Sequence, residues 1–148
     1  MSQTDQLSKF GQNIPFMARS GLKALKMDLD GIRIMMPLDP NINHIGTMYA
    51  GALWTLSESM GGAIYRVHLV REGTFPIVKA LNIKFLKPAL TDITCEYKME
   101  SALAREIVDT CIKKGKADYE ISLELKDAYG NVVATTDGFY QMRQGKGL

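Results

Sequence analysis

The 148-residue sequence has only two cysteines, two histidines and almost no excess of charge of either sign. Cys95 and Cys111 lie sixteen residues apart, without a CxxC motif or a nearby pair of histidines, so neither a disulfide scaffold nor a metal site is predicted. The 18 basic and 16 acidic residues leave a net charge of +2, which is too small to indicate a nucleic-acid partner. We therefore expect buried free thiols in the reducing cytoplasm.

Long apolar runs are also missing. The first thirteen residues lack a basic segment followed by an apolar one, so no signal peptide is expected. The least charged stretch, residues 44–65, is rich in small polar residues and too polar to span a bilayer. We therefore expect no membrane insertion.

The overall composition is that of an ordinary globular protein. Apolar residues make up 46% and charged residues 23%. A chain of this length fits one domain, residues 1–148, that buries roughly two-thirds of its unfolded surface.

The first half of the chain contains two short helical segments, a hairpin and a long helix. Residues 1–20 are expected to form one or two short helices. Alternation on both sides of Asp30-Gly31 predicts a β-hairpin over residues 25–36, with Leu25, Met27 and Leu29 on one face. Residues 47–70, with Thr47 as a possible N-cap, show no alternation and predict a buried helix that is apolar all round. Its small residues allow close approach of a sheet or of a second copy of the helix.

The second half predicts further strands and one surface helix. The strands are expected over residues 77–87, 93–99, 119–125 and 132–142. The surface helix runs from Ser101, as a cap, to Gly115, as a stop. This order predicts an α+β fold, in which an antiparallel sheet of five to six strands wraps around one long central helix.

Glu58 is the only charged side chain between His44 and Tyr65. An unpaired carboxylate on a buried helix is costly, so it should have a raised pKa, a partner or a catalytic task. The alternative is a glutamate at the helix surface, or one bonded to a neighbouring loop. His68, near the far end of the helix, is expected to be solvated or hydrogen-bonded.

Two further features precede Glu58. The loop Asn43-His44-Ile45-Gly46 could carry functional groups, or it could simply contain residues that favour turns. Gly51, in the first turn of the helix, offers free backbone N–H groups for an anion or a polarised carbonyl oxygen. Close packing of the helix against a neighbour explains the same glycine.

The run from Asn43 to Leu53, followed by Leu56-Ser57-Glu58, resembles the hotdog-fold acyl-CoA thioesterases. The nearest branches are the phenylacetate-type enzymes and a related hotdog group of unknown function. The phenylacetate-type branch carries Asn-x-x-Gly-x-x-His-Gly-Gly, with an acidic residue seven positions after the last Gly. Asn43, Gly46, Gly51 and Glu58 match those positions, and residues 81–89 resemble the long strand after the hotdog helix.

The resemblance implies hydrolysis of an acyl-CoA or a related acyl thioester. Glu58 would attack the thioester or activate water, and Asn43 would orient that water or the carboxylate. The Gly51 N–H would stabilise the oxyanion. Coenzyme A would be part of the substrate, and no metal or redox cofactor is needed.

The resemblance also implies residues around the substrate. Tyr49 and Trp54 would line the acyl pocket, and Lys79 would attract the phosphates of coenzyme A. A solvated strand face is the simpler explanation of this lysine. The remaining substrate-binding candidates are His44, Gly46 and Asn82.

A homodimer follows from the same resemblance. Two sheets would pair edge to edge, with Asn43 of one chain facing Glu58 of the other, and a dimer of dimers could assemble from these units. The active site would lie at the boundary between the subunits.

Two other functions stay open. Tyr49, Ala50 and Val78 stand where the family carries His, Gly and often Ser, which favours a non-catalytic acyl-CoA or lipid binder. A hydratase or dehydratase acting on acyl thioesters would instead pair His44 with Glu58, fourteen residues apart.

Overall fold

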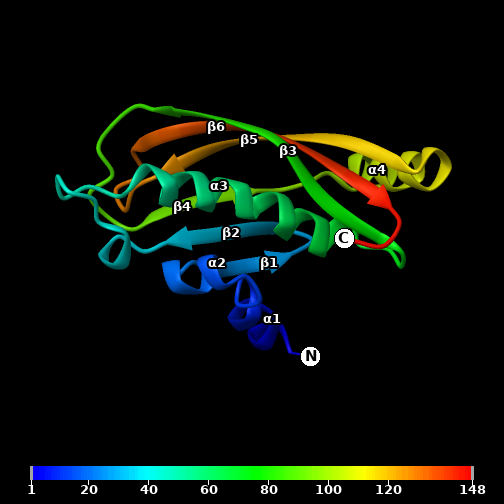
Figure 1. The fold of residues 1–148 in the computed structure, drawn as a ribbon, viewed down its shortest axis with the longest axis horizontal. Helices are drawn as coiled ribbons and strands as arrows, with labels where there is room; N and C mark the ends of the chain where they lie inside the picture. The colour runs from blue at the N-terminus through cyan, green and yellow to red at the C-terminus, as the bar shows by residue number, and fades with distance from the viewer. Residues whose placement is uncertain (1, 148) are drawn as a thin grey trace.

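The computed structural model describes residues 2–147 and contains one six-stranded antiparallel sheet (Figure 1). The strands are β1 (Lys23–Asp28), β2 (Gly31–Met36), β3 (Thr74–Phe85), β4 (Ile93–Tyr97), β5 (Lys116–Lys126) and β6 (Val132–Gln144). Their order across the sheet is β1-β2-β4-β5-β6-β3. The helices are α1 (Gln3–Lys9), α2 (Pro15–Ser20), α3 (Ala50–Ile64) and α4 (Ser101–Lys114), with a 3₁₀ turn at Asp39–Asn41 and a π-helical turn at Tyr65–Leu69 after α3.

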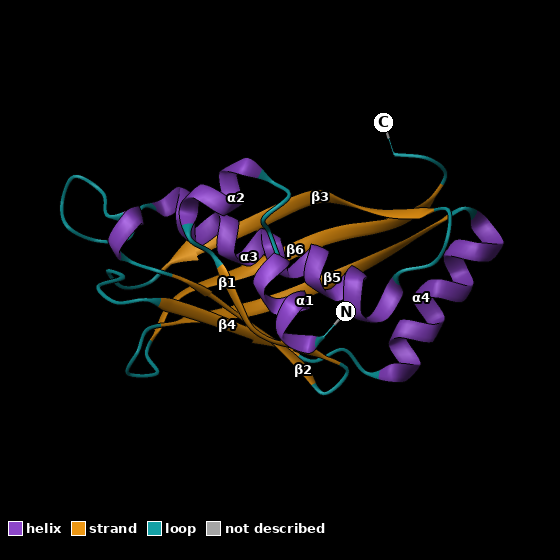
Figure 2. Ribbon diagram, turned by 90° about the horizontal axis from the view of Figure 1, so that it is seen from below, coloured by secondary structure: helices purple, strands orange, loops and turns teal. Residues whose placement is uncertain are grey.

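The sheet curves around α3, and α1 and α2 lie near β1 (Figures 1 and 2). Leu56, Met60 and Ile64 of α3 are fully buried. Strand β5 alternates buried and exposed residues along its whole length, as the sequence predicts. The predicted α+β arrangement of a sheet around one long helix is therefore confirmed. No helix among residues 2–147 is both long and apolar enough to cross a bilayer.

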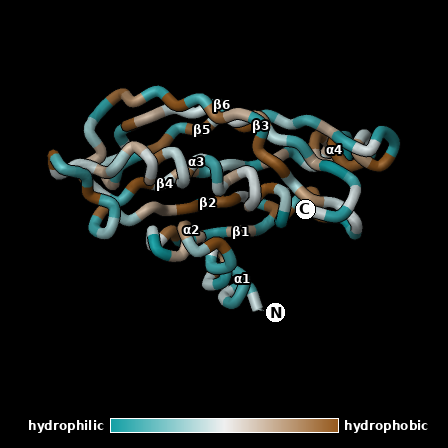
Figure 3. The backbone as a smooth tube through the Cα atoms, viewed as in Figure 1, coloured by the Kyte–Doolittle hydropathy of each residue, from teal (hydrophilic) through white to brown (hydrophobic). Residues whose placement is uncertain are grey.

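The predicted hairpin is present, but its first strand turns a different face to the core. A bulge between Ala24 and Lys26 shifts the register, so Ala24 and Met27 are buried. Leu25 and Leu29 are exposed, contrary to the prediction. Strand β2 needs no such correction, because its alternate apolar residues are buried. Figure 3 shows the hydrophobic colour along this strand.

Both long helices begin at residues other than those predicted. Helix α3 starts at Ala50 with Tyr49 as N-cap, and the hydroxyl of Thr47 accepts a hydrogen bond from Asn43 instead of capping the helix. Glu100, not Ser101, is the N-cap of α4. The predicted stop at Gly115 is confirmed, because this glycine adopts φ 84°, a left-handed conformation.

Gly61 and Gly62 of α3 face different surroundings. A β-carbon at Gly61 would overlap the ring of Tyr140 on β6, and one at Gly138 would overlap the same ring. The Tyr140 ring also stacks on Tyr119, with ring centroids 5.5 Å apart. A β-carbon at Gly62 would meet nothing within 4 Å. The sheet therefore accounts for the small residue at position 61, and Gly62 lies on the open side of the helix.

The two edges of the sheet are covered differently. Helix α1 contacts the edge strand β1. Among the described residues, β3 pairs only with β6, so its outer edge has no strand partner. Val78 and Phe85 on β3, and Leu86 just after it, expose 39%, 54% and 56% of their surface. An unpaired apolar edge of this kind favours pairing with another strand.

Candidate active site

Four residues share the face of α3 that points away from the sheet: Gly51, Trp54, Glu58 and Gly62. Their spacing of three or four residues places them in one row along the helix. Trp54 and Gly62 are exposed, and Gly51 and Glu58 are half-buried. We call this row the open face of α3. The candidate carboxylate therefore lies on the face of α3 opposite the sheet.

Glu58 lies at an open cavity of about 550 Å³, which is within the usual size range of small-molecule sites. Within residues 2–147 its carboxylate has neither an ion-pair nor a hydrogen-bond partner. Burial raises the pKa of Glu58 above its ordinary value. A desolvated carboxylate without a partner is a stronger base than a solvated one, as a catalytic role requires.

The Glu58 cavity is formed by two segments that are far apart in the sequence. Helix α3 and the residues after it supply Glu58, Ser59, Gly62, Tyr65, Arg66, Val70 and Pro76. The segment between α1 and α2, with the ends of both helices, supplies Lys9, Phe10, Gly11, Asn13, Ile14 and Met17.

Strand β6 anchors the turn of α3 that carries Glu58. The hydroxyl of Tyr140 donates to the backbone carbonyls of Ser57 and Glu58, at 3.4 Å each. The hydroxyl of Ser57 pairs with that of Thr136. Burial, with a contribution from the charge of Glu58, raises the pKa of Tyr140, which therefore stays a neutral donor. These bonds fix the helix backbone at the carboxylate relative to the sheet.

Asn43 shapes the loop before α3. Its Oδ1 accepts from the backbone N–H groups of Ile45 and Thr47, at 3.0 and 3.1 Å, and its Nδ2 donates to Oγ1 of Thr47 at 2.9 Å. Gly46 adopts φ 87°, which favours glycine. His44 and Gly46 are exposed in this loop.

The start of α3 has free backbone N–H groups. The N–H groups of Ala52 and Leu53 donate to the carbonyl of Tyr49, whereas Gly51 precedes them at a position where helices lack an internal acceptor. The Tyr49 ring occupies the space that a β-carbon at Gly51 would need, so this neighbour accounts for the glycine. Seven residues of helix separate Gly51 from Glu58 by about 10 Å along the axis. The two groups of one chain therefore cannot contact the same reacting carbonyl.

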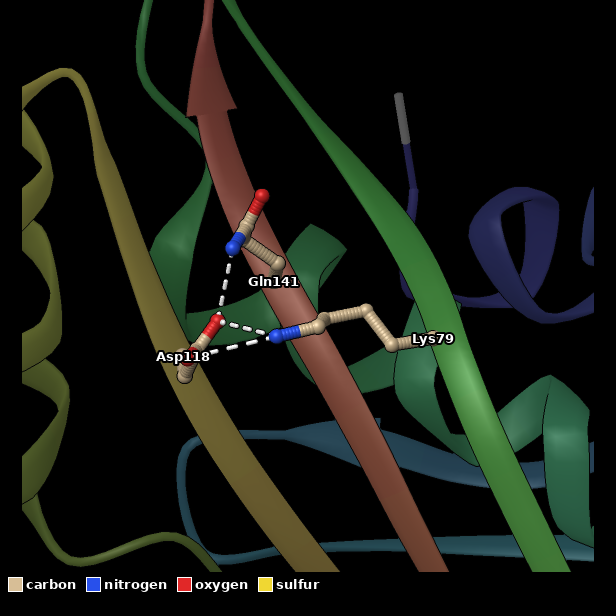
Figure 4. Close-up of polar contacts among 3 residues, drawn as sticks. All are labelled: Lys79, Asp118 and Gln141. Atoms are coloured by element: carbon tan, nitrogen blue, oxygen red, sulfur yellow. Dashed lines mark hydrogen bonds and ion pairs between the residues drawn. The ribbon is translucent and has the colours of Figure 1, made fainter.

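Lys79 and Asn82 lie on the outer face of the sheet, away from α3. Lys79 Nζ is 3.3 Å from the Asp118 carboxylate, which also accepts from Nε2 of Gln141 at 2.7 Å (Figure 4). The hydrogen bond from Gln141, together with Lys79, lowers the pKa of Asp118. The next residue, Tyr119, points toward α3 and donates to the carbonyl of Gly61, so Asp118 points the opposite way.

Asn82 is placed by its strand partner. It is in register with Asp137, whose exposed carboxylate accepts from Ser122. The structure therefore does not bring Lys79 or Asn82 to Glu58 within one chain.

The chain matches the model of a family described as a domain of unknown function, DUF4442, over residues 6–139. The chain belongs to the DUF4442 family. It is 36% identical to a Pseudomonas aeruginosa protein of unknown function described as a probable thioesterase, with a TM-score of 0.91 and 97% of each chain covered.

More distant solved structures share the fold. A protein of unknown function from Chlorobaculum tepidum is 18% identical, with a TM-score of 0.82 and coverage of 97% and 94%. A thioesterase from Haemophilus influenzae is 12% identical, with a TM-score of 0.71 and coverage of 97% and 92%. No curated protein matches the chain. The expected hotdog fold is confirmed for this DUF4442 member.

Sequence reasoning missed the segment before the hotdog sheet of this DUF4442 chain. Residues 1–20 are predicted only as short helices, yet Phe10, Ile14 and Met17 line the Glu58 cavity. Their spacing of four and three residues is a usable signal for one apolar face, but Pro15 breaks the pattern. Arg66 was missed as well, because a lone exposed arginine has no pattern around it.

The expectation for His68 is wrong for one of its two ring nitrogens. Its Nε2 is buried and has no hydrogen-bond partner among the described residues, and burial lowers its pKa. It lies in the same π-helical turn as Tyr65 and Arg66, but unlike them it does not line the Glu58 cavity. Within residues 2–147, no three side chains of His, Cys, Asp or Glu come together as a metal site would require.

Proposed function

We propose that this DUF4442 chain hydrolyses the thioester of an acyl-CoA or a related acyl thioester. The observation that carries the proposal is Glu58, an unpaired carboxylate whose pKa is raised by burial, at a largely apolar cavity. The description of the Pseudomonas aeruginosa relative as a probable thioesterase supports the reaction class.

The active site is built from two chains. One chain cannot present both the Gly51 N–H and the Glu58 carboxylate to one carbonyl, because helix rise separates them. Two α3 helices running in opposite directions would bring the start of one helix to Glu58 of the other. The unpaired edge of β3 and its exposed apolar side chains support a homodimer with continuous sheets.

The chemistry uses groups of the chain and one water. The thioester oxygen sits against the Gly51 N–H, where the helix dipole favours the negative charge that develops. Glu58 takes a proton from water while the water oxygen bonds to the acyl carbon. The carbon–sulfur bond of the resulting intermediate then breaks, the protonated Glu58 returns its proton to the sulfur, and a free acid and coenzyme A leave. Attack by Glu58 itself, through an anhydride that water then cleaves, gives the same products.

The other site residues have supporting roles in this proposal. Tyr49 and Trp54, exposed near the start of α3, would contact the acyl group. Within residues 2–147, Asn43 uses one Nδ2–H in the bond to Thr47, and its second Nδ2–H would orient the water. Exposed His44 and Gly46 would border the thioester, and Lys79 and Asn82 would meet coenzyme A only from the outer face of the sheet.

The test is a panel of acyl-CoAs assayed for free thiol release by the purified protein. Thiol release supports the hydrolase. Saturable thermal stabilisation by acyl-CoA without release would show a binder instead. Loss of the absorbance of an α,β-unsaturated thioester without thiol release would show a hydratase.

A charge on the β3 edge is expected to dissociate the dimer. Phe85→Lys places an ammonium on an edge residue that is 54% exposed, so it costs the isolated chain little but opposes strand pairing. Sedimentation should show a dimer for the wild type and a monomer for the variant. Leu25→Lys, at the 43% exposed Leu25 of β1, is the matched control and should stay dimeric. A monomeric wild type would contradict the proposal.

We also propose that the protein works in the cytoplasm. Cys95 and Cys111 are buried free thiols, as predicted, and burial raises the pKa of both. Such thiols suit a reducing compartment.

A further inference from the structure

We propose that Phe10, Ile14 and Met17, which come from the segment between the two N-terminal helices and from the first turn of α2, form one wall of the acyl-chain site, and that Ile14 limits the length of chain that the protein accepts. The inference rests on the proposed function, because the chain that enters the cavity belongs to the thioester hydrolysed at Glu58. It adds a specificity element outside the sheet and α3.

The composition of the Glu58 cavity identifies an apolar occupant. Phe10, Ile14 and Met17 come from the N-terminal side, and Val70 lies on the opposite side. Ile14 and Val70 expose 48% and 50% of their surface, so a hydrocarbon chain between them removes apolar area from water on both sides. Glu58 is the one carboxylate among the lining residues, which connects the cavity to the proposed chemistry.

On the α3 side of the cavity, an acyl chain has room to approach the helix backbone closely. A β-carbon at Gly62 would meet nothing within 4 Å, and Gly62 lies one turn after Glu58 on the open face of α3. A chain that passes Glu58 can therefore run along α3 toward Val70. Two exposed cations, Lys9 and Arg66, also border the cavity and suit an anionic substrate.

The wall is held in place at both ends. Phe10 and Met17 are each only 6% exposed and belong to the core. Gly11 between them adopts φ 75°, and its carbonyl accepts from the N–H of Ile14 at 3.2 Å. Pro15 starts α2. Ile14 is therefore a partly exposed apolar residue at a fixed backbone position. Such a residue can limit the length of the acyl chain that binds.

The test compares Ile14→Trp with Phe16→Trp in the full-length protein. Ile14 has extended backbone that accepts a larger side chain, and Phe16 is 56% exposed and does not line the cavity. We expect Ile14→Trp to lower kcat/KM for dodecanoyl-CoA by at least about tenfold while acetyl-CoA changes less than about twofold. Phe16→Trp should keep the wild-type profile. An unchanged profile for Ile14→Trp would overturn the inference.

A binding measurement separates this inference from the proposed function. Calorimetric titration with dodecyl-CoA, a thioether that cannot be hydrolysed, measures binding in the cavity separately from hydrolysis. Weaker binding to Ile14→Trp than to Phe16→Trp supports the wall even if the wild type releases no thiol. Equal binding to both variants, or no binding to the wild type, overturns the wall whatever the hydrolysis assay gives. Thermal denaturation of each variant confirms that it is folded.

Discussion

Glu58→Gln is expected to lower kcat/KM for acyl-CoA hydrolysis by about 10²–10⁴-fold, the usual contribution of a general base. The amide is nearly the same size as the carboxyl group, so the cavity keeps its shape, but it can neither accept the proton of water nor attack the thioester. Thiol release at saturating and limiting substrate measures the loss. Glu72→Gln, at an exposed glutamate beyond α3, is the matched control and should keep wild-type activity. A Glu58→Gln protein within a few-fold of wild type would remove Glu58 from the mechanism.

The thermal stability of Glu58→Gln should show that its loss of kcat/KM is not caused by unfolding. Burial raises the pKa of Glu58 in the folded state, so its charged form destabilises the fold relative to its neutral form. The stabilisation from the neutral carboxyl group is complete below the unfolded pKa and is lost as pH rises through the higher folded pKa. At neutral pH, Glu58→Gln should therefore melt at or above the wild-type temperature.

Ionisation of Glu58 should raise the hydrolysis rate of the wild type, although it lowers the stability of the fold. Only the ionised form of Glu58 can act as base or nucleophile. The rate should therefore rise with pH through an apparent pKa above 4.5, the ordinary value for this group. A pH–rate profile of kcat/KM measures this value for the free protein.

Gly61→Ala is expected to destabilise the fold by about 2 kcal/mol. The added methyl group would overlap the Tyr140 ring, which is 3% exposed and confined by Gly138 and Tyr119. Overpacking of this kind costs about 1–3 kcal/mol, and the gain in helix propensity returns at most about 1 kcal/mol. We expect the melting temperature to fall by about 6 °C.

The neighbouring glycine provides the matched control. Gly62→Ala adds the same methyl group in the same helix, but into open space. It should leave stability unchanged or raise it by up to about 1 kcal/mol. Urea denaturation of both variants measures the difference, and equal effects at the two positions would show that the Tyr140 ring adapts to the methyl group.

The sequence predicts those parts of the fold that depend on a regular period. Alternation along β5 gives its buried face directly, because a strand without a bulge keeps one face inward. The same reasoning fails for Leu25, since one extra residue at a bulge exchanges the faces and leaves no sign in the pattern. The start of α3 also differs, because Asn43 uses the Thr47 hydroxyl for the loop.

The candidate site is predictable in the same uneven way. Glu58 stands out because it is the one charge in a long uncharged stretch, and the structure leaves it unpaired at a cavity. Ile14 does not stand out, because its relation to Glu58 depends on a tertiary contact between segments more than forty residues apart. Lys79 fits a phosphate-binding pattern by composition, but the sheet places it beside Asp118.

The fit of Tyr140 between Gly61 and Gly138 has a consequence for how this sequence can change. A larger residue at either glycine costs stability unless a smaller one replaces Tyr140, so changes at the three positions are coupled. Because Tyr140 also donates to the carbonyls of Ser57 and Glu58, such an exchange would remove the support of the carboxylate. If Glu58 is the proposed catalytic group, changes at this contact lower activity before a second change restores packing, and this non-additive penalty should preserve Gly61, Gly138 and Tyr140 together.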